Sequence, residues 1–251
     1  MQTDVDEMFK GRIRELAKLS ANGNCCMFTD FLNPAEQSYI LTTQKSLPAS
    51  AAFFGGYGTA ERVIAKFGSV YEPSYDVPYP ITILQITPLN PKFSDKLTHR
   101  DFLGAVLNLG IDRKLTGDIL TDGTDGWIFV RDHIAGYIEE SLTHVKHTSV
   151  KAVEAENIPE GIIHEPETIF LTVPSLRLDA VISKAFNISR REVDKLLASE
   201  KIFVNSIIRS KASCLLKEGD LISVRGFGRV RYIETSGDTR KGNLKIRIDR
   251  Y

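Results

Sequence analysis

The fold of the last third of the chain is decided by residues 177–205, RLDAVISKAFNISRREVDKLLASEKIFVN. Hydrophobic residues recur there first at helical spacing and then in a short run of β-branched and aromatic side chains. This pattern predicts two short helices, 178–186 and 190–199, and then a strand, 202–205. Two more strands are expected downstream, near 221–224 and 230–234.

The second of these helices begins with a cluster of positive charge. Ser189 and Glu192 form an S-x-x-E capping box that fixes the helix start, and Arg190 and Arg191 occupy the first turn. The helix macrodipole disfavours cations at this end, so the two arginines are expected to face an anion. Backbone N–H groups and guanidinium groups together suit a phosphate, which arginine can bind with two parallel hydrogen bonds. Lys195 lies one turn further on, and the cluster therefore predicts a phosphate-binding site.

Polar side chains on neighbouring elements would widen this site. Asn205 and Lys211 are expected to reach the sugar or base edges of RNA. The full set of expected RNA-binding residues is Arg177, Ser189, Arg190, Arg191, Lys195, Lys201, Asn205, Arg209, Lys211, Arg225 and Arg229. An alternative stays open, in which the two arginines of the first turn pair with Asp194 and Glu192 on a solvated helix surface.

The order and spacing of these segments resemble the S4 domain of RNA-binding proteins. The segments that carry the resemblance are Arg177 to Val181, Ser189 to Val193, Leu196-Leu197, Ile202 to Asn205 and Lys217 to Arg225. The resemblance implies two packed helices against a small twisted sheet, an αL-type arrangement that holds RNA on its helix face. The chain departs from the S4 pattern at Glu200 and Ser206, where glycine is common.

Charge is divided unevenly along a chain of 251 residues whose formal net charge is zero. Residues 175–251 contain 17 Lys and Arg against 9 Asp and Glu, a balance of +8. Subtraction from the totals of 32 and 32 leaves 15 against 23, or −8, for residues 1–174. A basic part joined to an acidic remainder is typical of a nucleic-acid-binding domain. A basic domain that docks on an acidic protein partner would have the same composition, so an adaptor function remains an alternative.

Length and composition indicate a cytoplasmic protein of two or three compact domains. No apolar run is long enough to cross a bilayer, and the first ten residues are acidic where a signal peptide would be basic. The cysteines, Cys25, Cys26 and Cys214, are too few for a disulfide framework or a four-thiolate zinc site, which fits a reducing cytosol. We therefore expect an α+β monomer with no membrane partner, metal or cofactor.

A middle segment, residues 76–157, has the expected element order β-α-β-β-α-β. Strands are predicted over 81–87, 117–121, 127–131 and 149–155, and helices over 98–109 and 133–142. Three local signals support the assignment: a capping box of Thr98 with Asp101, a hairpin turn over 122–126, and Asp132 as the cap of the second helix. This order predicts a ferredoxin-like or RRM-like sheet that binds RNA.

The third strand of this sheet carries two aromatic residues on one face. Trp127 and Phe129 alternate along the strand, as the base-stacking aromatics of an RRM do. However, Asp125 and Asp132 stand where the RRM motif has a basic and an aromatic residue. Burial against a flanking domain explains two alternating aromatics equally well, so packing is the alternative to base stacking.

The N-terminal segment, residues 1–75, is expected to form a small α/β domain. Its signals are an amphipathic helix over 4–19, a helix that starts at Asn33-Pro34 and runs towards Lys45, and an apolar run, 51–54, before Gly55-Gly56.

Across nearly its full length the chain resembles the bacterial YlmH-like proteins. The resemblance rests on the S4 segments together with Phe31 to Gln37, Gly55-Gly56-Tyr57 with Glu61-Arg62, and Asp101 to Ala105. It implies two N-terminal domains joined to an S4 domain at 174–251. It also implies binding to rRNA and tRNA, on the ribosomal large subunit with peptidyl-tRNA in ribosome-associated quality control, and a link to cell division.

Several short motifs are similar to parts of catalytic or metal sites, but the other residues that such sites require are missing. Arg177-Leu178-Asp179 is similar to the catalytic strand of pseudouridine synthases, but it lies inside the S4 match and no large domain follows. His99-Arg100-Asp101 imitates a kinase catalytic loop, but Val106 stands where that loop has asparagine. His144 and His147 have no carboxylate or cysteine partners nearby in sequence. We therefore expect no catalytic or metal-binding residues, with an RNA-modifying enzyme of the pseudouridine-synthase type as the alternative.

Overall fold

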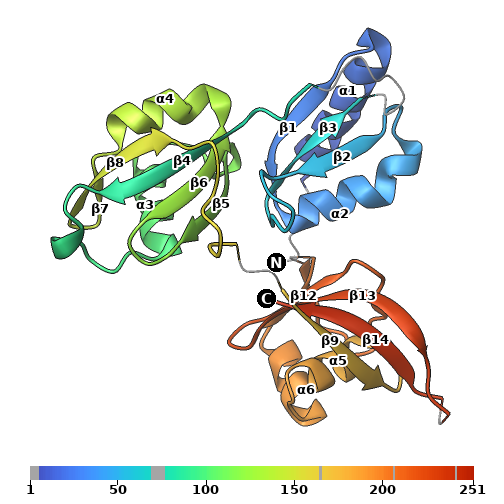
Figure 1. The fold of residues 1–251 in the computed structure, drawn as a ribbon. Coiled ribbons are helices and arrows are strands. Elements are labelled where there is room, and N and C mark those ends of the chain that lie inside the picture. Colours follow the sequence, from blue (N-terminus) through green and yellow to red (C-terminus); the bar gives the residue numbers. More distant parts are fainter. Residues whose placement is uncertain (1–5, 69–76, 164–165, 206, 241) are drawn as a thin grey trace. The chain divides into compact units, whose positions relative to one another are not determined.

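The computed structural model describes residues 6–68, 77–163, 166–205, 207–240 and 242–251. Its contacts divide the described chain into two compact units, a first within 7–163 and a second within 166–251 (Figure 1). Both units combine helices and strands, so the fold is α+β, as expected. The expected domains 1–75, 76–157 and 174–251 stay a prediction.

The first unit begins with a three-stranded antiparallel sheet in the order β1-β3-β2. Its elements are α1 (Glu7–Gly23), β1 (Met27–Leu32), α2 (Pro34–Thr43), the 3₁₀ turn η1 (Gln44–Ser46), β2 (Ala51–Phe54) and β3 (Val63–Phe67). Ile13 and Leu16 of α1, Ile40 of α2 and Phe67 of β3 are buried in one hydrophobic cluster. The expected first helix, 4–19, begins outside the described residues, and α1 continues to Gly23.

The start of α2 shows how local sequence fixes a helix end. The side-chain oxygen of Asn33 accepts hydrogen bonds from the backbone N–H groups of Ala35 (2.9 Å) and Glu36 (3.0 Å). The Glu36 carboxylate in turn accepts one from the Asn33 N–H (2.7 Å). Pro34 has no N–H to satisfy at the first helical position. The expected helix start at Asn33-Pro34 is therefore confirmed.

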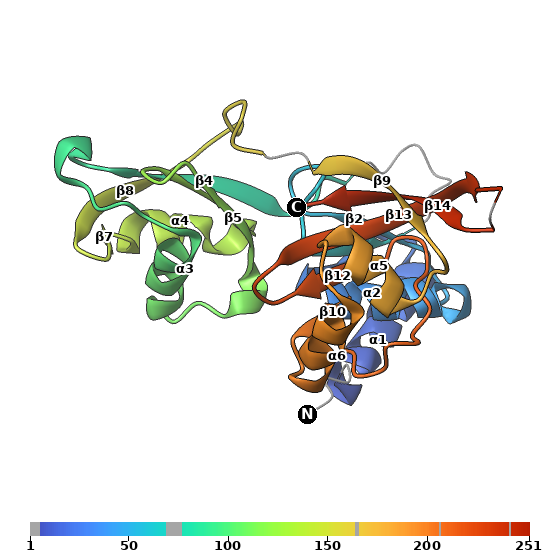
Figure 2. The ribbon, with the colours of Figure 1, turned by 90° about the horizontal axis from the view of Figure 1, so that it is seen from below.

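The rest of the first unit is a five-stranded antiparallel sheet in the order β5-β6-β4-β8-β7, with two helices on one face (Figure 2). Its elements are β4 (Ile81–Pro88), η2 (Pro91–Phe93), α3 (His99–Asn108), η3 (Arg113–Leu115), β5 (Thr116–Thr121), β6 (Gly126–Arg131), α4 (Asp132–Ser141), β7 (His144–Val145) and β8 (Thr148–Glu154). The main elements follow the expected order β-α-β-β-α-β, and the short strand β7 is added as a hairpin with β8.

Two of the three local signals in this sheet are confirmed. The Asp101 carboxylate accepts hydrogen bonds from the backbone N–H (2.8 Å) and the hydroxyl (2.6 Å) of Thr98. The Asp122 carboxylate stabilises the hairpin turn by accepting hydrogen bonds from the backbone N–H groups of Thr124 and Asp125, each at 2.8 Å. The expected cap of α4 is wrong, because Arg131 takes the N-cap position and Asp132 is the first helical residue.

The second unit is a six-stranded antiparallel sheet, in the order β11-β10-β12-β13-β14-β9, packed against two helices. Its elements are β9 (Glu167–Val173), α5 (Leu178–Ala185), α6 (Arg190–Ala198), β10 (Ile202–Val204), β11 (Ile207–Ile208), β12 (Leu221–Val224), β13 (Gly228–Asp238) and β14 (Leu244–Arg250). Val181 of α5 and Val193 of α6 are fully buried in the same cluster as Val230 and Ile246 of the sheet. Both helices and the strands over 202–204 and 221–224 agree with the sequence prediction.

Strand β14 was not predicted from the sequence. This strand pairs with β9 along its full length, from Leu244 opposite Val173 to Arg250 opposite Glu167. The partners are more than 70 positions apart in sequence, so no local pattern marks the pairing. As a result, β9 belongs to the sheet of the second unit, although its residues precede the expected start at 174.

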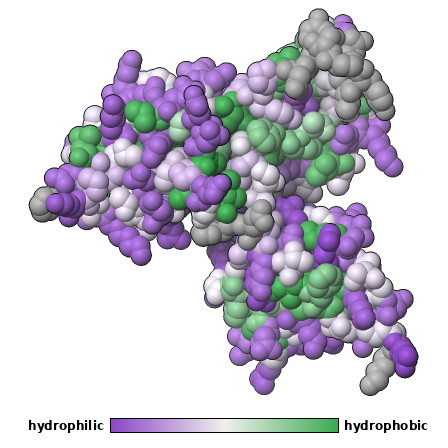
Figure 3. All heavy atoms as spheres, viewed as in Figure 1, coloured by the Kyte–Doolittle hydropathy of each residue, from purple (hydrophilic) through white to green (hydrophobic). Residues whose placement is uncertain are grey.

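The face of the molecule drawn in Figure 3 is mainly hydrophilic, and hydrophobic residues gather there in small groups. Among the described helices, none has the length and apolar character needed to span a membrane.

Candidate nucleic-acid interface

Helix α6 is fixed by a cap at its start and by an apolar side that faces the core. Ser189 Oγ accepts a hydrogen bond from the Glu192 backbone N–H (3.2 Å), which is half of the expected capping box. Val193, Leu196 and Leu197 are buried among the side chains of the sheet. Because these three residues set the rotation of the helix, its charged residues lie on the opposite, exposed side.

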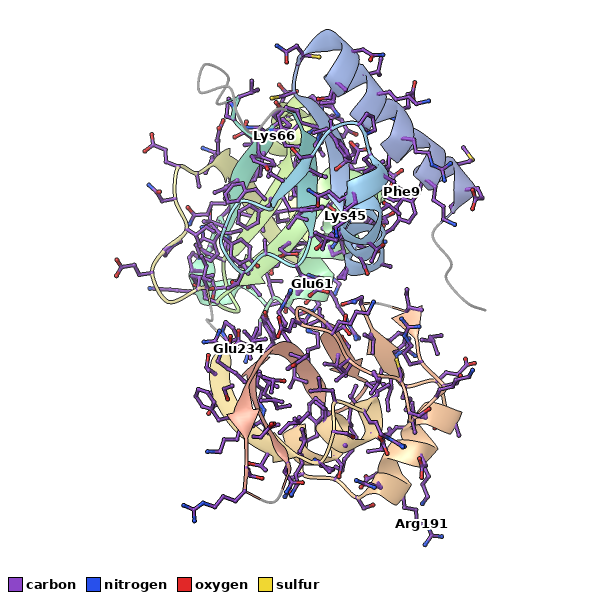
Figure 4. The ribbon with its side chains drawn as sticks, turned by 90° about the vertical axis from the view of Figure 1, so that its right-hand side faces the viewer. Phe9, Lys45, Glu61, Lys66, Arg191 and Glu234 are labelled. Atoms are coloured by element: carbon purple, nitrogen blue, oxygen red, sulfur yellow. The ribbon has the colours of Figure 1, made fainter. Side chains whose placement is uncertain are left out.

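Arg190, Arg191 and Lys195 are exposed on that side. Within the described part of the chain, the side chains of these three residues form no ion pair and no hydrogen bond. Arg191 extends away from the α6 ribbon (Figure 4). Neutralisation by Asp194 or Glu192 is therefore not found among these residues, and the first turn of α6 presents two guanidinium groups to its surroundings.

Arg177 differs from this pair because it already has a carboxylate partner. Its Nε and Nη2 donate to the two carboxylate oxygens of Asp179, at 3.0 and 3.2 Å, and Asp179 is only 6% exposed. The hydrogen bond and charge of Asp179 raise the pKa of Arg177. The RNA contact of Arg177 stays a prediction, and the structure shows in addition that its guanidinium neutralises a buried acid in the first turn of α5. The same pairing gives the Arg-Leu-Asp motif a structural role.

Asn205 also has its side chain engaged within the chain. Its amide nitrogen donates to Asp220 (2.8 Å), and its amide oxygen accepts from the Leu221 backbone N–H (3.0 Å). Its φ of 51° lies in the left-handed region, which asparagine tolerates better than most residues. Asn205 therefore ties the β10–β11 turn to the start of β12, and its contact with RNA sugar or bases stays a prediction.

Lys201 and Arg225 lie together at the ends of paired strands. The Arg225 backbone N–H donates to the Lys201 carbonyl oxygen (2.9 Å), and the Arg225 guanidinium carbon lies 4.9 Å from the centroid of the Phe203 ring. Both basic residues are exposed. The aromatic contact holds the guanidinium against β10 while its edge stays accessible, which suits binding of a phosphate.

The other expected residues of the second unit are spread over several elements. Lys211 is exposed in the loop between β11 and β12, and Arg209 is half-buried. Arg229 is half-buried on β13, with its guanidinium carbon 5.9 Å from the centroid of the Tyr251 ring. The described contacts therefore single out the exposed face of α6 and the Lys201–Arg225 pair as the most open basic groups.

The aromatic residues of β6 are buried, which corrects the expectation of base stacking. Trp127 is 2% exposed and Phe129 is 0% exposed. Phe129 lies in a cluster with Phe31 and Ile64 of the N-terminal sheet, and the Tyr57 ring stacks on it at a centroid distance of 5.2 Å. The packing alternative therefore holds for Phe129, because the N-terminal sheet covers the face on which an RRM stacks bases.

Gly56 shows how closely the two sheets of the first unit approach. Its φ of +100° lies in the region that side chains rarely adopt. A Cβ added there would lie 2.3 Å from the Phe129 ring. Only glycine fits at this position, so the Gly55-Gly56 pair has a structural role in the packing.

A polar network joins the same two sheets beside this aromatic cluster. Asp118 of β5 accepts hydrogen bonds from Tyr57 Oη (2.8 Å) and from the backbone N–H groups of Glu61 (2.6 Å) and Arg62 (3.1 Å). Arg62 donates to the carbonyl oxygens of Phe31, Arg113 and Thr116, which belong to two separate segments. No local sequence pattern could have identified this network, because its members come from three separated segments.

Burial perturbs the charged members of this network. It raises the pKa of Asp118, against the opposing effects of the Tyr57 hydrogen bond and the Arg62 charge. Burial and then the charge of Arg62 lower the pKa of Arg113 to about 10, so this guanidinium stays charged at neutral pH. Displaced pKa values can mark a catalytic site. Here Asp118 accepts three hydrogen bonds from its own chain, so we assign the network to holding the sheets together.

Metal-binding side chains do not converge in the described residues, which contain no group of three or more His, Cys, Asp and Glu suited to hold an ion. The three cysteines are free thiols, with Cys25 exposed and the other two partly exposed.

Comparison with known proteins places this geometry in a family. The profile described as "Putative RNA-binding domain in YlmH" matches residues 75–158, the five-stranded sheet of the first unit. The chain is 30% identical over 229 residues to the ribosome-associated protein quality control protein P2 of Bacillus subtilis, covering 88% of this chain and 86% of the relative. The solved structure of the cell division protein YlmH from Streptococcus pneumoniae matches with a TM-score of 0.50 at 25% identity. That match covers 62% of this chain and 94% of the other. This chain therefore belongs to the YlmH family.

Proposed function

We propose that the protein binds structured RNA of the ribosome, and that the exposed face of α6 is its principal phosphate-binding surface. The observation that carries this proposal is the pair of exposed arginines at the start of α6, which have no acidic partner among the described residues. Backbone N–H groups of a helix start and two guanidinium groups suit a phosphate. The surface would be extended by the other polar and basic residues of this unit, Ser189, Lys195, Lys201, Arg209, Lys211, Arg225 and Arg229.

The second unit has the two helices and small sheet that an S4 domain would have, and its basic charge supports the same assignment. The relative from Bacillus subtilis is named for quality control on the ribosome, and the matched profile is named for RNA binding. We infer that the large ribosomal subunit, with rRNA and peptidyl-tRNA as contacts, is the binding partner. The protein would act in the cytoplasm as a monomer and by binding alone, without a catalytic step. The name of the pneumococcal structure supports a link to cell division.

Charge reversal at the start of α6 tests this proposal. Arg190→Glu combined with Arg191→Glu should abolish co-sedimentation of the full-length protein with purified large subunits, because phosphates are repelled where they were bound. The thermal unfolding midpoint should stay within about 2 °C of the parent, since both side chains are exposed and their changes are surface substitutions. Retained binding at ordinary salt would contradict the assignment of the site.

A matched control separates the site from total charge. Lys217→Glu combined with Arg240→Glu makes the same change in net charge at exposed positions of the same unit, outside the proposed surface. This control should sediment with large subunits as the parent does. Digestion of the ribosomal RNA should release the parent protein. Binding that survives nuclease would instead favour the adaptor function, in which the basic unit docks on a protein.

A further inference from the structure

Both faces of the five-stranded sheet in the first unit are covered, including the face with which an RRM binds RNA. One face is covered by α3 and α4, whose residues Phe102 and Ile138 are buried against Ile128. The opposite face packs through Phe129 onto Phe31 of the N-terminal sheet. If this part of the protein contacts RNA, as the matched profile suggests, the contact must use a different surface.

A cavity of about 480 Å³ is lined by residues of α3, of the β7–β8 hairpin and of the end of α4. Its volume is within the range of roughly 300–1,000 Å³ that is common for ligand sites. Hydrogen-bonding side chains of Arg100, Asn108, Thr143, His144 and Lys146 line it. No aromatic ring lines this cavity apart from that imidazole, so its chemistry suits phosphates and sugars better than stacked bases.

The charges of the cavity favour an anion. Arg100 is exposed on the first turn of α3 and takes part in no ion pair within the described residues. The single carboxylate in the lining belongs to Asp101. It accepts from Thr98 and lies 3.0 Å from Lys146 Nζ. The pairing with Lys146 offsets the charge of that carboxylate, and the Lys146 ammonium has three N–H donors, so it can donate to a ligand as well.

The hairpin holds Lys146 and His144 at the cavity. Lys146 has a φ of 53°, which places a bulky residue in the left-handed region. The two ring nitrogens of His144 lie 3.1 Å from Thr143 Oγ1 and 3.2 Å from Ser149 Oγ. The basic side chains are therefore positioned by the hairpin backbone and by neighbours, which is the preorganisation that a binding site needs.

Small residues leave the α3 side of the cavity open. Gly104 lines it, and a Cβ added to this glycine would meet nothing within 4 Å. The α3 wall of the cavity is therefore not crowded by other side chains at Gly104.

We propose that this cavity binds the sugar–phosphate backbone of RNA and forms a second contact site, separate from α6, in the first unit of the protein. The proposal rests on the proposed function, because it assumes that the RNA-bound protein uses both units. Arg100 and Lys146 would bind phosphate oxygens, and Asn108 and Thr143 would donate to or accept from ribose hydroxyls. Binding at two sites of one chain would raise the total affinity through effective concentration.

The open space at Gly104 allows a sharp test. Gly104→Glu adds a negative charge to a residue that lines the cavity, at a position where the new Cβ meets nothing within 4 Å, and it replaces a poor helix former by a good one. Gly136→Glu is the matched control, because Gly136 is exposed on α4, also has nothing within 4 Å of an added Cβ, and does not line the cavity. Arg100→Gln removes one proposed phosphate contact without adding negative charge.

The readout is the dissociation constant of the full-length variants for large-subunit rRNA freed of protein, and for intact large subunits. We expect Gly104→Glu to raise both dissociation constants about tenfold and Gly136→Glu to leave both unchanged. Arg100→Gln should make the slope of log K against log salt shallower by about 0.7. All three variants should unfold at the parent temperature or above.

Three outcomes would overturn the cavity proposal. Equal binding by Gly104→Glu and the parent, while the α6 double variant loses binding, would remove the cavity and leave the proposed function intact. Equal losses in Gly104→Glu and Gly136→Glu would show a general charge effect. A loss with intact subunits but none with free rRNA would point to a ribosomal protein as the ligand of this cavity. Normal binding by both Gly104→Glu and the α6 double variant would instead remove the proposed function and this inference together.

Discussion

Helix α6 and strand β6 both carry the kinds of residue that contact RNA, yet these residues are exposed on α6 and buried on β6. The arginines at the start of α6 are exposed and have no acidic partner among the described residues. Phe129 on β6 is fully buried beneath Tyr57. The difference follows from chemistry. Arginine side chains are rarely buried without a partner, whereas an aromatic ring stacks on a base or packs in a core equally well. The exposure of charged residues at a helix start can therefore be predicted from sequence more reliably than the exposure of aromatic residues on a strand.

The largest effect that would test this comparison is on stability. Phe129→Ala should lower the free energy of unfolding by about 3–5 kcal/mol, because it removes a buried ring from the contact between the two sheets of the first unit. Chemical denaturation measures the loss. The affinity of the folded fraction for rRNA should change less than twofold. A drop in affinity with normal stability would mean that the ring contacts a base after all.

An intermediate effect concerns the geometry of the α6 arginines. Arg190→Lys combined with Arg191→Lys keeps the charge but removes the paired N–H groups that bind two phosphate oxygens at once. We expect the affinity for rRNA to fall about threefold to tenfold, as measured by filter binding, with a nearly unchanged salt dependence. An affinity equal to that of the parent would show that only charge matters there.

The smallest effect lies in the first turn of α3, where Asp101 is the acidic residue of a capping box with Thr98. Hydrogen bonds from Thr98, and then Lys146, lower the pKa of Asp101 from 3.8 to about 2. A pKa that is lower in the folded chain stabilises the fold above the ordinary value, and the stabilisation is lost as pH falls towards about 2. The stability difference between the parent and Asp101→Asn should therefore be present at pH 6 and shrink between pH 4 and pH 2. A difference that is constant with pH would contradict the assigned role of the carboxylate.

Local signals in the sequence were sufficient for much of the fold. The caps at Asn33 and Thr98, the turn at Asp122 and the hydrophobic side of α6 depend on neighbours within four residues. Strand β14 could not be found in this way, because its partner β9 lies far back in the sequence. Strands β1 and β3 were also missed, since their buried patterns lack a regular alternation.

In the candidate site too, the features that depend on local sequence were predicted and those that depend on distant segments were not. The exposure of Arg190 and Arg191 follows from the capping residue and the apolar spacing of their own helix. The intrachain partners of Arg177 and Asn205 depend on the exact conformation of loops, and the burial of Phe129 depends on residues 31, 57 and 64 of another sheet. Sequence patterns alone do not show which residues a distant segment will cover.

The most direct test of the central claim is the salt dependence of rRNA binding by the parent and by Arg190→Gln combined with Arg191→Gln. If about five phosphates are contacted, the parent should lose about a hundredfold in affinity between about 50 and 200 mM salt. Loss of two contacts at about 0.7 each should make the slope of log K against log salt shallower by about 1.4. Identical slopes for the two proteins would contradict the claim that these arginines bind phosphate.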